Sequence, residues 1–155
     1  MARAPFQVLV LPFRRTSDGA VEFAILRRRD LGLWQGVAGG GEDDETPSQA
    51  AVREASEELG LDRWVPLYPL QTVASIPARL FAARQTWPKG TYVIPQYAFA
   101  ADLTGLDVTL SKEHTAVRWL DAKAAQAALR FDSNRTALGE LAERLEADDL
   151  ADPVG

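Results

Sequence analysis

The N-terminal part of the chain has the hydrophobic pattern of two β-strands joined by a turn. Residues 6–11 form a short, nearly continuous apolar segment, and apolar side chains alternate with other residues between 21 and 27. The intervening Asp18-Gly19 is a dipeptide typical of tight turns between strands. The pattern therefore predicts a β-hairpin.

Later segments repeat the strand pattern and then change to the period of a helix. Apolar residues predict further strands at 67–76, 92–100, 106–110 and 115–119. Pro95 lies within the second of these, which indicates a sheet edge or a bulge. A short alanine-rich helix should follow Asp121, a last helix should cover 134–147, and a polar tail follows residue 148. Together these elements predict a layered α/β fold.

The best-marked helix covers residues 47–59. Thr46 offers an N-cap hydroxyl, Pro47 suits the first helical position, and Gln49 completes a capping box. Gly60 follows as a C-cap glycine. The helix has a stripe of mostly small apolar side chains, which should press closely on the sheet: Ala51, Val52, Ala55 and Leu59.

Three glutamates of this helix lie together on one face, because Glu54, Glu57 and Glu58 are spaced i, i+3 and i+4. Their mutual repulsion would be removed by a cation, and carboxylate oxygens suit Mg²⁺ or Mn²⁺. A solvated acidic face is the ordinary alternative. The preceding glycine triplet at 39–41 favours a ligand site, since glycine lets the backbone approach a ligand closely and adopt positive φ.

Residues 39–61 resemble a complete Nudix box, the signature of the Nudix hydrolases. The match runs from Gly39 through five residues to Glu45, then through seven residues to the segment 53–61, which is Arg-Glu-Ala-Ser-Glu-Glu-Leu-Gly-Leu. The resemblance implies one Nudix domain over residues 1–155, with a mixed β-sheet sandwiched between helices (α/β/α). It also implies a hydrolase of phosphoric anhydride bonds that depends on Mg²⁺, with Mn²⁺ as a possible substitute.

Segments outside the box resemble the branch that contains the dihydroneopterin triphosphate diphosphatases, also described as dATP pyrophosphohydrolases. They are residues 34–39, 113–114, 119–121 and 133–135. Many Nudix proteins have a proline where this chain has Ala38, but related members of this branch also lack it. The resemblance implies cleavage of dATP or dihydroneopterin triphosphate to a monophosphate and pyrophosphate.

Other functions remain open at this point. ADP-ribose, dinucleoside polyphosphates and oxidised nucleotides are alternative substrates, since fold-level analogy is weak evidence for a substrate. A catalytically silent Nudix-fold binding module would have a broken box, whereas this box is intact. A structural protein with an acidic surface helix would not account for the glycines and arginine in register.

The box also implies roles for individual residues. Glu54, Glu57 and Glu58 are the expected metal ligands, with the backbone carbonyl of Ala38 or Gly39 as an additional one. Arg53 is expected to pair with a box carboxylate and to orient the others. Glu45 is the candidate partner of Arg53, and the remaining structural positions of the box are Gly39 and Gly60.

Glu113 is the candidate for a general base or a further metal ligand, and it also matches the branch pattern. It lies at 111–114, between two predicted strands, where a loop could swing it over the metals. A box glutamate is the alternative base. His114 is the only histidine of the chain, and we assign it no chemistry.

The substrate contacts are predicted from charge and from the branch pattern. Arg3 and Arg28, with Arg29 as the alternative to Arg28, are candidates for phosphate binding, because the guanidinium fork suits such oxygens. Ser133 matches a branch position near the expected pocket. Aromatic side chains could stack on a purine or pterin, above all Phe81 and Trp87 on the loop 77–90. The other aromatic candidates are Trp34, Tyr92 and Phe131.

Composition narrows the class of partner. With 155 residues, 46% hydrophobic and 25% charged, the chain suits one globular domain. A formal net charge of -5 disfavours nucleic acid polymers and favours a small nucleotide or pterin polyphosphate. The chain has no cysteine, which excludes disulfides and thiolate metal sites but does not indicate a redox compartment. The apolar run 8–13 is too short to span a membrane, and no cleavable signal follows it. We therefore expect a cytoplasmic protein, whose oligomeric state the sequence leaves open.

Overall fold

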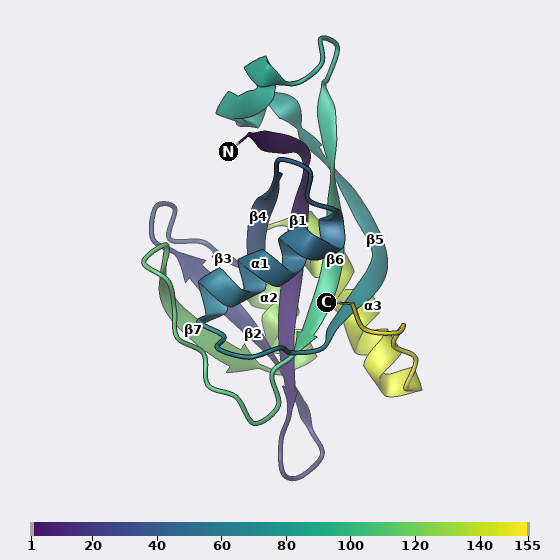
Figure 1. The fold of residues 1–155 in the computed structure, drawn as a ribbon. Coiled ribbons are helices and arrows are strands. Elements are labelled where there is room, and N and C mark those ends of the chain that lie inside the picture. Colours follow the sequence, from purple (N-terminus) through teal and green to yellow (C-terminus); the bar gives the residue numbers. More distant parts are fainter. Residues whose placement is uncertain (1, 155) are drawn as a thin grey trace.

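The computed structural model describes residues 2–154 of the chain, which form one mixed β-sheet with helices on both faces (Figure 1). The strands are β1 (Arg3–Arg15), β2 (Val21–Arg28), β3 (Trp34–Gln35), β4 (Val37–Glu42), β5 (Leu67–Pro77), β6 (Val93–Asp102) and β7 (His114–Leu120). The helices are α1 (Pro47–Leu59), α2 (Ala122–Ala128) and α3 (Asp132–Ala147), with two short 3-10 helices, η1 (Ala78–Leu80) and η2 (Ala82–Thr86).

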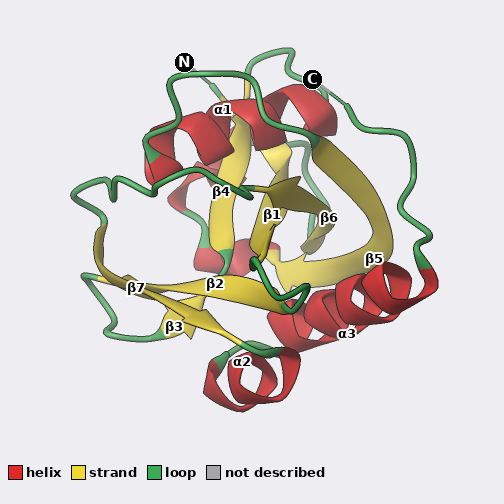
Figure 2. Ribbon diagram, turned by 90° about the horizontal axis from the view of Figure 1, so that it is seen from below, coloured by secondary structure: helices red, strands yellow, loops and turns green. Residues whose placement is uncertain are grey.

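Strand β1 is the centre of the sheet. The strand order is β3-β2-β1-β6-β5, with β4 paired to β1 and β7 paired to β2. Strand β1 runs antiparallel to β2 and β4 and parallel to β6, so the sheet is mixed. Figure 2 shows α1 on one face of the sheet and α2 and α3 on the other. The predicted α/β/α architecture is confirmed.

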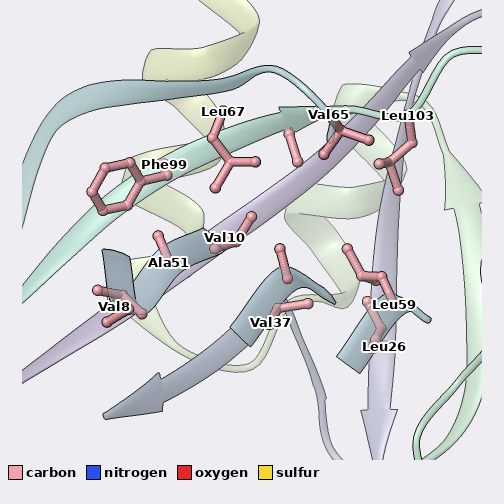
Figure 3. Close-up of a cluster of buried hydrophobic side chains, with 13 residues drawn as sticks. Val8, Val10, Leu26, Val37, Ala51, Leu59, Val65, Leu67, Phe99 and Leu103 are labelled. Atoms are coloured by element: carbon pink, nitrogen blue, oxygen red, sulfur yellow. The ribbon is translucent and has the colours of Figure 1, made fainter. Parts of the chain in front are cut away.

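Two apolar clusters hold these layers together. On one face of β1, Val8 and Val10 belong to the same buried cluster as Ala51 and Leu59 of α1, and Figure 3 draws these side chains. On the other face, Leu9 and Leu11 belong to the cluster beneath α2 and α3. Because side chains alternate along a strand, one buried strand supplies both cores. Each fully buried aliphatic side chain contributes about 1.5–3 kcal/mol relative to its exposed state.

The predicted local signals are confirmed where they were strongest. The hairpin of β1 and β2 forms with Phe13 opposite Phe23. Helix α1 covers residues 47–59, its capping box is complete, and Gly60 ends it in the left-handed conformation. The Asp121 side chain accepts a hydrogen bond from the backbone N–H of Ala124 at the start of α2.

At Pro95, strand β6 is paired with β5 on one side but not yet with β1 on the other. It stands opposite Ser75 of β5, whereas the pairing of β6 with β1 begins one residue later, at Gln96. The strand is interior as a whole, but at Pro95 it is a local edge. The missing N–H therefore removes no hydrogen bond to β1.

The strand predicted at 106–110 is wrong. This segment has no strand pairing, although Leu106, Val108 and Leu110 pack against the core on the α1 side. Its alternating pattern arises because alternate side chains point to the core while the backbone runs over the end of α1. The backbone N–H of Thr109 donates to the carbonyl of Leu59 at 3.0 Å.

The tail after residue 148 is more than a polar extension. Leu150 packs against the α2–α3 side of the core, and Val154 forms an antiparallel bridge with Leu67 at the edge of β5. Among residues 2–154, no helix combines the length and apolar character needed to cross a membrane.

Candidate active site

The three glutamates predicted to bind metal lie together at the C-terminal half of α1. One carboxylate oxygen from each of Glu54, Glu57 and Glu58 can be chosen so that all three atoms lie within 4.8 Å of one another. The side chains of Glu54 and Glu58 are 12% and 8% exposed, while that of Glu57 is 55% exposed. The cluster therefore has a buried side against the sheet and an open side toward solvent.

Arg53 binds the carboxylates that surround this cluster. Its Nε and Nη2 donate to the two oxygens of Glu45, at 2.9 and 3.0 Å, so the structure pairs Arg53 with its candidate partner and the contact is bidentate. Its Nη1 lies 3.1 Å from Glu54 and 3.4 Å from Glu57. Its Nη2 also donates to the carbonyl of Gly40 at 2.8 Å, which ties α1 to β4.

The glycine triplet of β4 serves close packing. The expectation that it needs positive φ is wrong, because Gly39, Gly40 and Gly41 lie in an extended strand and none of them has positive φ. An added Cβ at Gly39 would lie 2.1 Å from Cδ of Glu54, and one at Gly40 would overlap the guanidinium of Arg3. The strand can therefore lie directly against a metal-ligand candidate and an arginine.

Burial and charge set the ionisation of the box residues. Burial raises the pKa of Glu54 to about 7, an effect that Arg53 opposes and that Glu57 and Glu58 reinforce. The hydrogen bond from Arg53 holds the pKa of Glu45 below its usual value. The same hydrogen bond raises the pKa of Arg53 above its ordinary value. Glu45 and Arg53 thus form a fixed ion pair beside a carboxyl group that is easily protonated.

Glu58 accepts a hydrogen bond from one residue and lies close to another, and we had assigned a role to neither. Ser111 Oγ donates to Glu58 Oε2, and His114 Nδ1 lies 3.0 Å from the same oxygen. The His114 side chain is 4% exposed. Nothing in the sequence around Glu58 predicts its contact with a loop that is distant in the chain. The one indication was the position of His114 next to Glu113, which matches the branch pattern.

The loop at 111–114 is fixed by several hydrogen bonds. The backbone N–H of Arg29 donates to the carbonyl of Glu113 at 2.9 Å, and Arg29 Nε donates to the carbonyl of Lys112 at 2.6 Å. The backbone N–H of Glu113 donates to Ser111 Oγ at 3.2 Å. We expected a loop that swings over the metals, whereas in this structure the loop is anchored with the Glu113 side chain exposed beside a cavity.

That cavity has a volume of about 1130 Å³ and lies next to the glycine strand. It brings together seven predicted site residues that are far apart in the sequence: Arg3, Arg28, Ala38, Gly39, Phe81, Glu113 and Ser133. Arg28 is also paired with Asp30. Burial lowers the pKa of Arg3 from its ordinary value, with Glu54 acting in the opposite direction.

The aromatic candidates separate into two groups. Phe81 and Phe131 line the cavity, and the guanidinium of Arg3 lies 4.9 Å from the centre of the Phe81 ring. Trp34 contacts Arg118, and Trp87 is buried with its Nε1 donating to the carbonyl of Arg3 at 2.7 Å. Tyr92 is exposed beside Arg84. The latter three are outside the residues that line the cavity.

Carboxamide side chains are the cavity residues that sequence reasoning missed. Gln7, Gln35, Gln96 and Asn134 all line it, and the last three are almost fully buried. Asn134 Oδ1 accepts the backbone N–H of Gly36 at 2.8 Å, so this side chain docks α3 onto the segment between β3 and β4. A glutamine in an otherwise apolar strand was the signal that could have identified Gln96.

Comparison with known proteins identifies the family of the chain. The NUDIX domain family matches residues 5–140. Dihydroneopterin triphosphate diphosphatase of Escherichia coli K12 is 30% identical over 138 residues, which are 88% of this chain and 91% of that protein. The structure of the E. coli enzyme has a TM-score of 0.71, with 89% of this chain and 94% of that chain covered.

A protein of Listeria monocytogenes described as a NUDIX hydrolase is more similar in structure. It has a TM-score of 0.85 and 48% identity, and the comparison covers 95% of this chain and 98% of that chain. An Ap4A hydrolase of Caenorhabditis elegans, at 19% identity and a TM-score of 0.71, shares the fold.

The chain is a hydrolase of phosphoric anhydride bonds, with a mixed β-sheet between helices. The chain belongs to the Nudix family. Within that family it is similar to the dihydroneopterin triphosphate diphosphatase of E. coli in both sequence and structure.

Proposed function

We propose that this protein is a Mg²⁺-dependent pyrophosphohydrolase that cleaves dATP, dihydroneopterin triphosphate or a closely related triphosphate to a monophosphate and pyrophosphate. The observation that carries the proposal is the position of the glutamate cluster. Glu54 lies directly beneath Gly39, and Gly39 lines a cavity large enough for a nucleotide. Similarity to the E. coli enzyme supports the choice of substrate.

The donor set suits a hard divalent cation. Glu54, Glu57 and Glu58 offer carboxylate oxygens within 4.8 Å of one another, and Mg²⁺ combines such ligands with waters and substrate phosphates. The backbone carbonyl of Ala38 or Gly39 is the proposed additional ligand. When bound, the metal supplies Lewis-acid stabilisation of phosphate oxygens and lowers the pKa of a coordinated water.

The side chains of the chain itself have separate tasks in this proposal. Arg53 holds Glu54 and Glu57 in place through Nη1 while its other nitrogens bind Glu45. Arg3 and Arg28 line the cavity and bind the phosphate oxygens, with Ser133 as a further substrate contact. Glu113 accepts a proton from the attacking water, or else completes the metal site, in which case a box glutamate is the base.

The test is the turnover of purified protein on a panel of substrates with Mg²⁺. The panel contains dATP, the other nucleoside triphosphates, dihydroneopterin triphosphate and ADP-ribose, and the products are pyrophosphate and monophosphates. We expect pyrophosphate from dATP or dihydroneopterin triphosphate. If only ADP-ribose reacts, the proposed substrate is wrong.

A variant of the cluster tests the site itself. Glu57→Gln should lower turnover by at least about 100-fold, because loss of a metal ligand should cost no less than loss of the groups that support one. Glu143→Gln is the matched control, since Glu143 is an exposed helical glutamate of α3 with no partner among the described residues. Equal turnover in both variants would refute the ligand assignment.

A further inference from the structure

Between β1 and β6, the side chains change from apolar residues in the core to carboxamides at the cavity. On the face covered by α2 and α3, Leu9 and Ala98 are neighbours in the core, and Gln7 and Gln96 are the next pair of the same register. Gln96 is 4% exposed. Burying an amide group is unfavourable, because it loses its hydrogen bonds to water, unless other partners replace them.

The direction of hydrogen bonding in this row is fixed by an arginine. Arg3 can only donate, and its Nη2 donates to Gln7 Oε1 at 3.1 Å. Gln7 therefore presents its Nε2, which donates to Gln96 Oε1 at 2.9 Å. The row ends at Gln96, whose one side-chain hydrogen bond to residues 2–154 uses Oε1, so that its Nε2 remains free to donate in the cavity. The cavity therefore offers a hydrogen-bond donor at this point.

A second buried amide faces the same cavity without a partner. Gln35 is 5% exposed, lines the cavity, and its side chain makes no hydrogen bond to any residue between 2 and 154. Its backbone is held by β3, which pairs Gln35 with Leu26 of β2. A free carboxamide presents a donor and an acceptor side by side. Neither atom is among the fully buried polar atoms that lack a partner, so the amide is reached from the cavity, where water or a ligand can meet both groups.

We infer that Gln35 and Gln96 are the residues that select the heterocycle of the substrate. Gln35 pairs with a ring edge that has a donor next to an acceptor, as an aminopurine or the lactam of a pterin offers. Gln96 donates to a ring nitrogen or carbonyl oxygen. This inference rests on the proposed function and extends it to the chemical class of the recognised group.

The position of Gln96 relative to the phosphate end supports this assignment. Gln7, which orients Gln96, stands opposite Gly40 in the pairing of β1 and β4, next to the glycine that covers Glu54. Apolar side chains of Ile76, Leu80 and Phe131 line other parts of the cavity and can contact the faces of a planar ring. A polyphosphate attached to that ring can then extend toward Gly39.

The experiment measures binding, so it does not depend on turnover. The ligands are α,β-methylene dATP and dihydroneopterin, with methylene diphosphonate as a ligand that has no heterocycle, each with Mg²⁺. The variants are Gln35→Met and Gln96→Met, which keep the length of the side chain but remove the amide. Gln71→Met is the matched control, because the Gln71 side chain is exposed on β5 outside the cavity.

We expect Gln35→Met to weaken one of the two heterocyclic ligands by about 10- to 100-fold, the range of a lost two-point amide contact. Gln96→Met should weaken the same ligand by a smaller factor. Methylene diphosphonate should bind equally to all variants. Which heterocycle loses affinity distinguishes an adenine from a pterin substrate.

Two results would overturn the inference. One is a wild-type protein that binds neither heterocyclic ligand more tightly than methylene diphosphonate. The other is a Gln35→Met variant with wild-type affinity for both. The proposed function fails by a different result, the absence of pyrophosphate release from every triphosphate, so the two failures are distinguishable.

Discussion

Replacement of Gly39 by alanine should weaken the metal site, because the added Cβ would overlap the side chain of Glu54. The added Cβ would lie 2.1 Å from Cδ of Glu54, whereas 3.4 Å is an ordinary contact. Glu54 or the strand must therefore move by about 1.3 Å, the difference between these two distances. Alanine itself is not strained at this position, because the φ of Gly39 is not positive.

The expected consequence is weaker metal binding in a folded protein. A displacement of this size exceeds the precision of about 0.5 Å that a functional site requires. We expect Mg²⁺ or Mn²⁺ affinity to fall by about 10- to 100-fold, which corresponds to ~1.4–2.7 kcal/mol. Titration of Mn²⁺ measures the affinity, and circular dichroism checks that the sheet is intact.

A double-mutant cycle with Glu54→Gln tests whether the effect passes through Glu54. If it does, Gly39→Ala should add little to a protein that already lacks the Glu54 carboxylate. Gly139→Ala is the control, because its Cβ would meet only Gln126 at an ordinary 3.5 Å. Unchanged affinity in Gly39→Ala, or strictly additive effects in the cycle, would refute the reasoning.

Three further predictions concern proton chemistry and stability. Glu113→Gln should lower turnover by about 10²-fold or more and change the pH–rate profile if Glu113 supplies the base; wild-type turnover with an unchanged profile would exclude it from the site. Because the metal-free pKa of Glu54 is raised to about 7, Mn²⁺ affinity should rise by roughly tenfold per pH unit below pH 7 and level off above it, and a pH-independent affinity would contradict this. Glu140 accepts hydrogen bonds from the backbone N–H groups of Gln71 and Thr72 and from Arg144; burial raises its pKa, but these bonds outweigh that effect and lower it. Because the pKa of Glu140 is lower in the folded state, its ionised carboxylate stabilises the fold above the ordinary pKa of 4.5, and this stability is lost as the pH falls through the folded-state pKa. Glu140→Gln should therefore lower the free energy of unfolding by ~2 kcal/mol at pH 7 and by less below pH 4.5. Urea unfolding at several pH values measures this difference.

Local interactions explain why helix α1 could be predicted in full. Its start depends on Thr46, Pro47 and Gln49, which contact one another within a single turn, and its end depends on Gly60 alone. The period of the helix then places Glu54, Glu57 and Glu58 on one face without any help from the rest of the chain. The acidic cluster was therefore determined by the sequence itself.

Short-range patterns could mislead where tertiary packing decides the backbone. The alternation at 106–110 is real, but the segment lies over the C-terminal end of α1 and has no strand beside it. The glycine triplet suggested unusual backbone angles, whereas the reason for it is the proximity of Glu54 and Arg3. Both errors come from contacts with elements that are distant in the sequence.

The sequence by itself determined the helix, its carboxylates and the ion pair of Arg53 with Glu45, since these residues are at most a few turns apart. Only the tertiary structure decided which groups surround them. Ser111 reaches Glu58 across 53 positions of the chain, and Gln7 reaches Gln96 across 89. The physical reason is that such pairs depend on the order and register of strands in the sheet, which the pattern of any one segment does not contain.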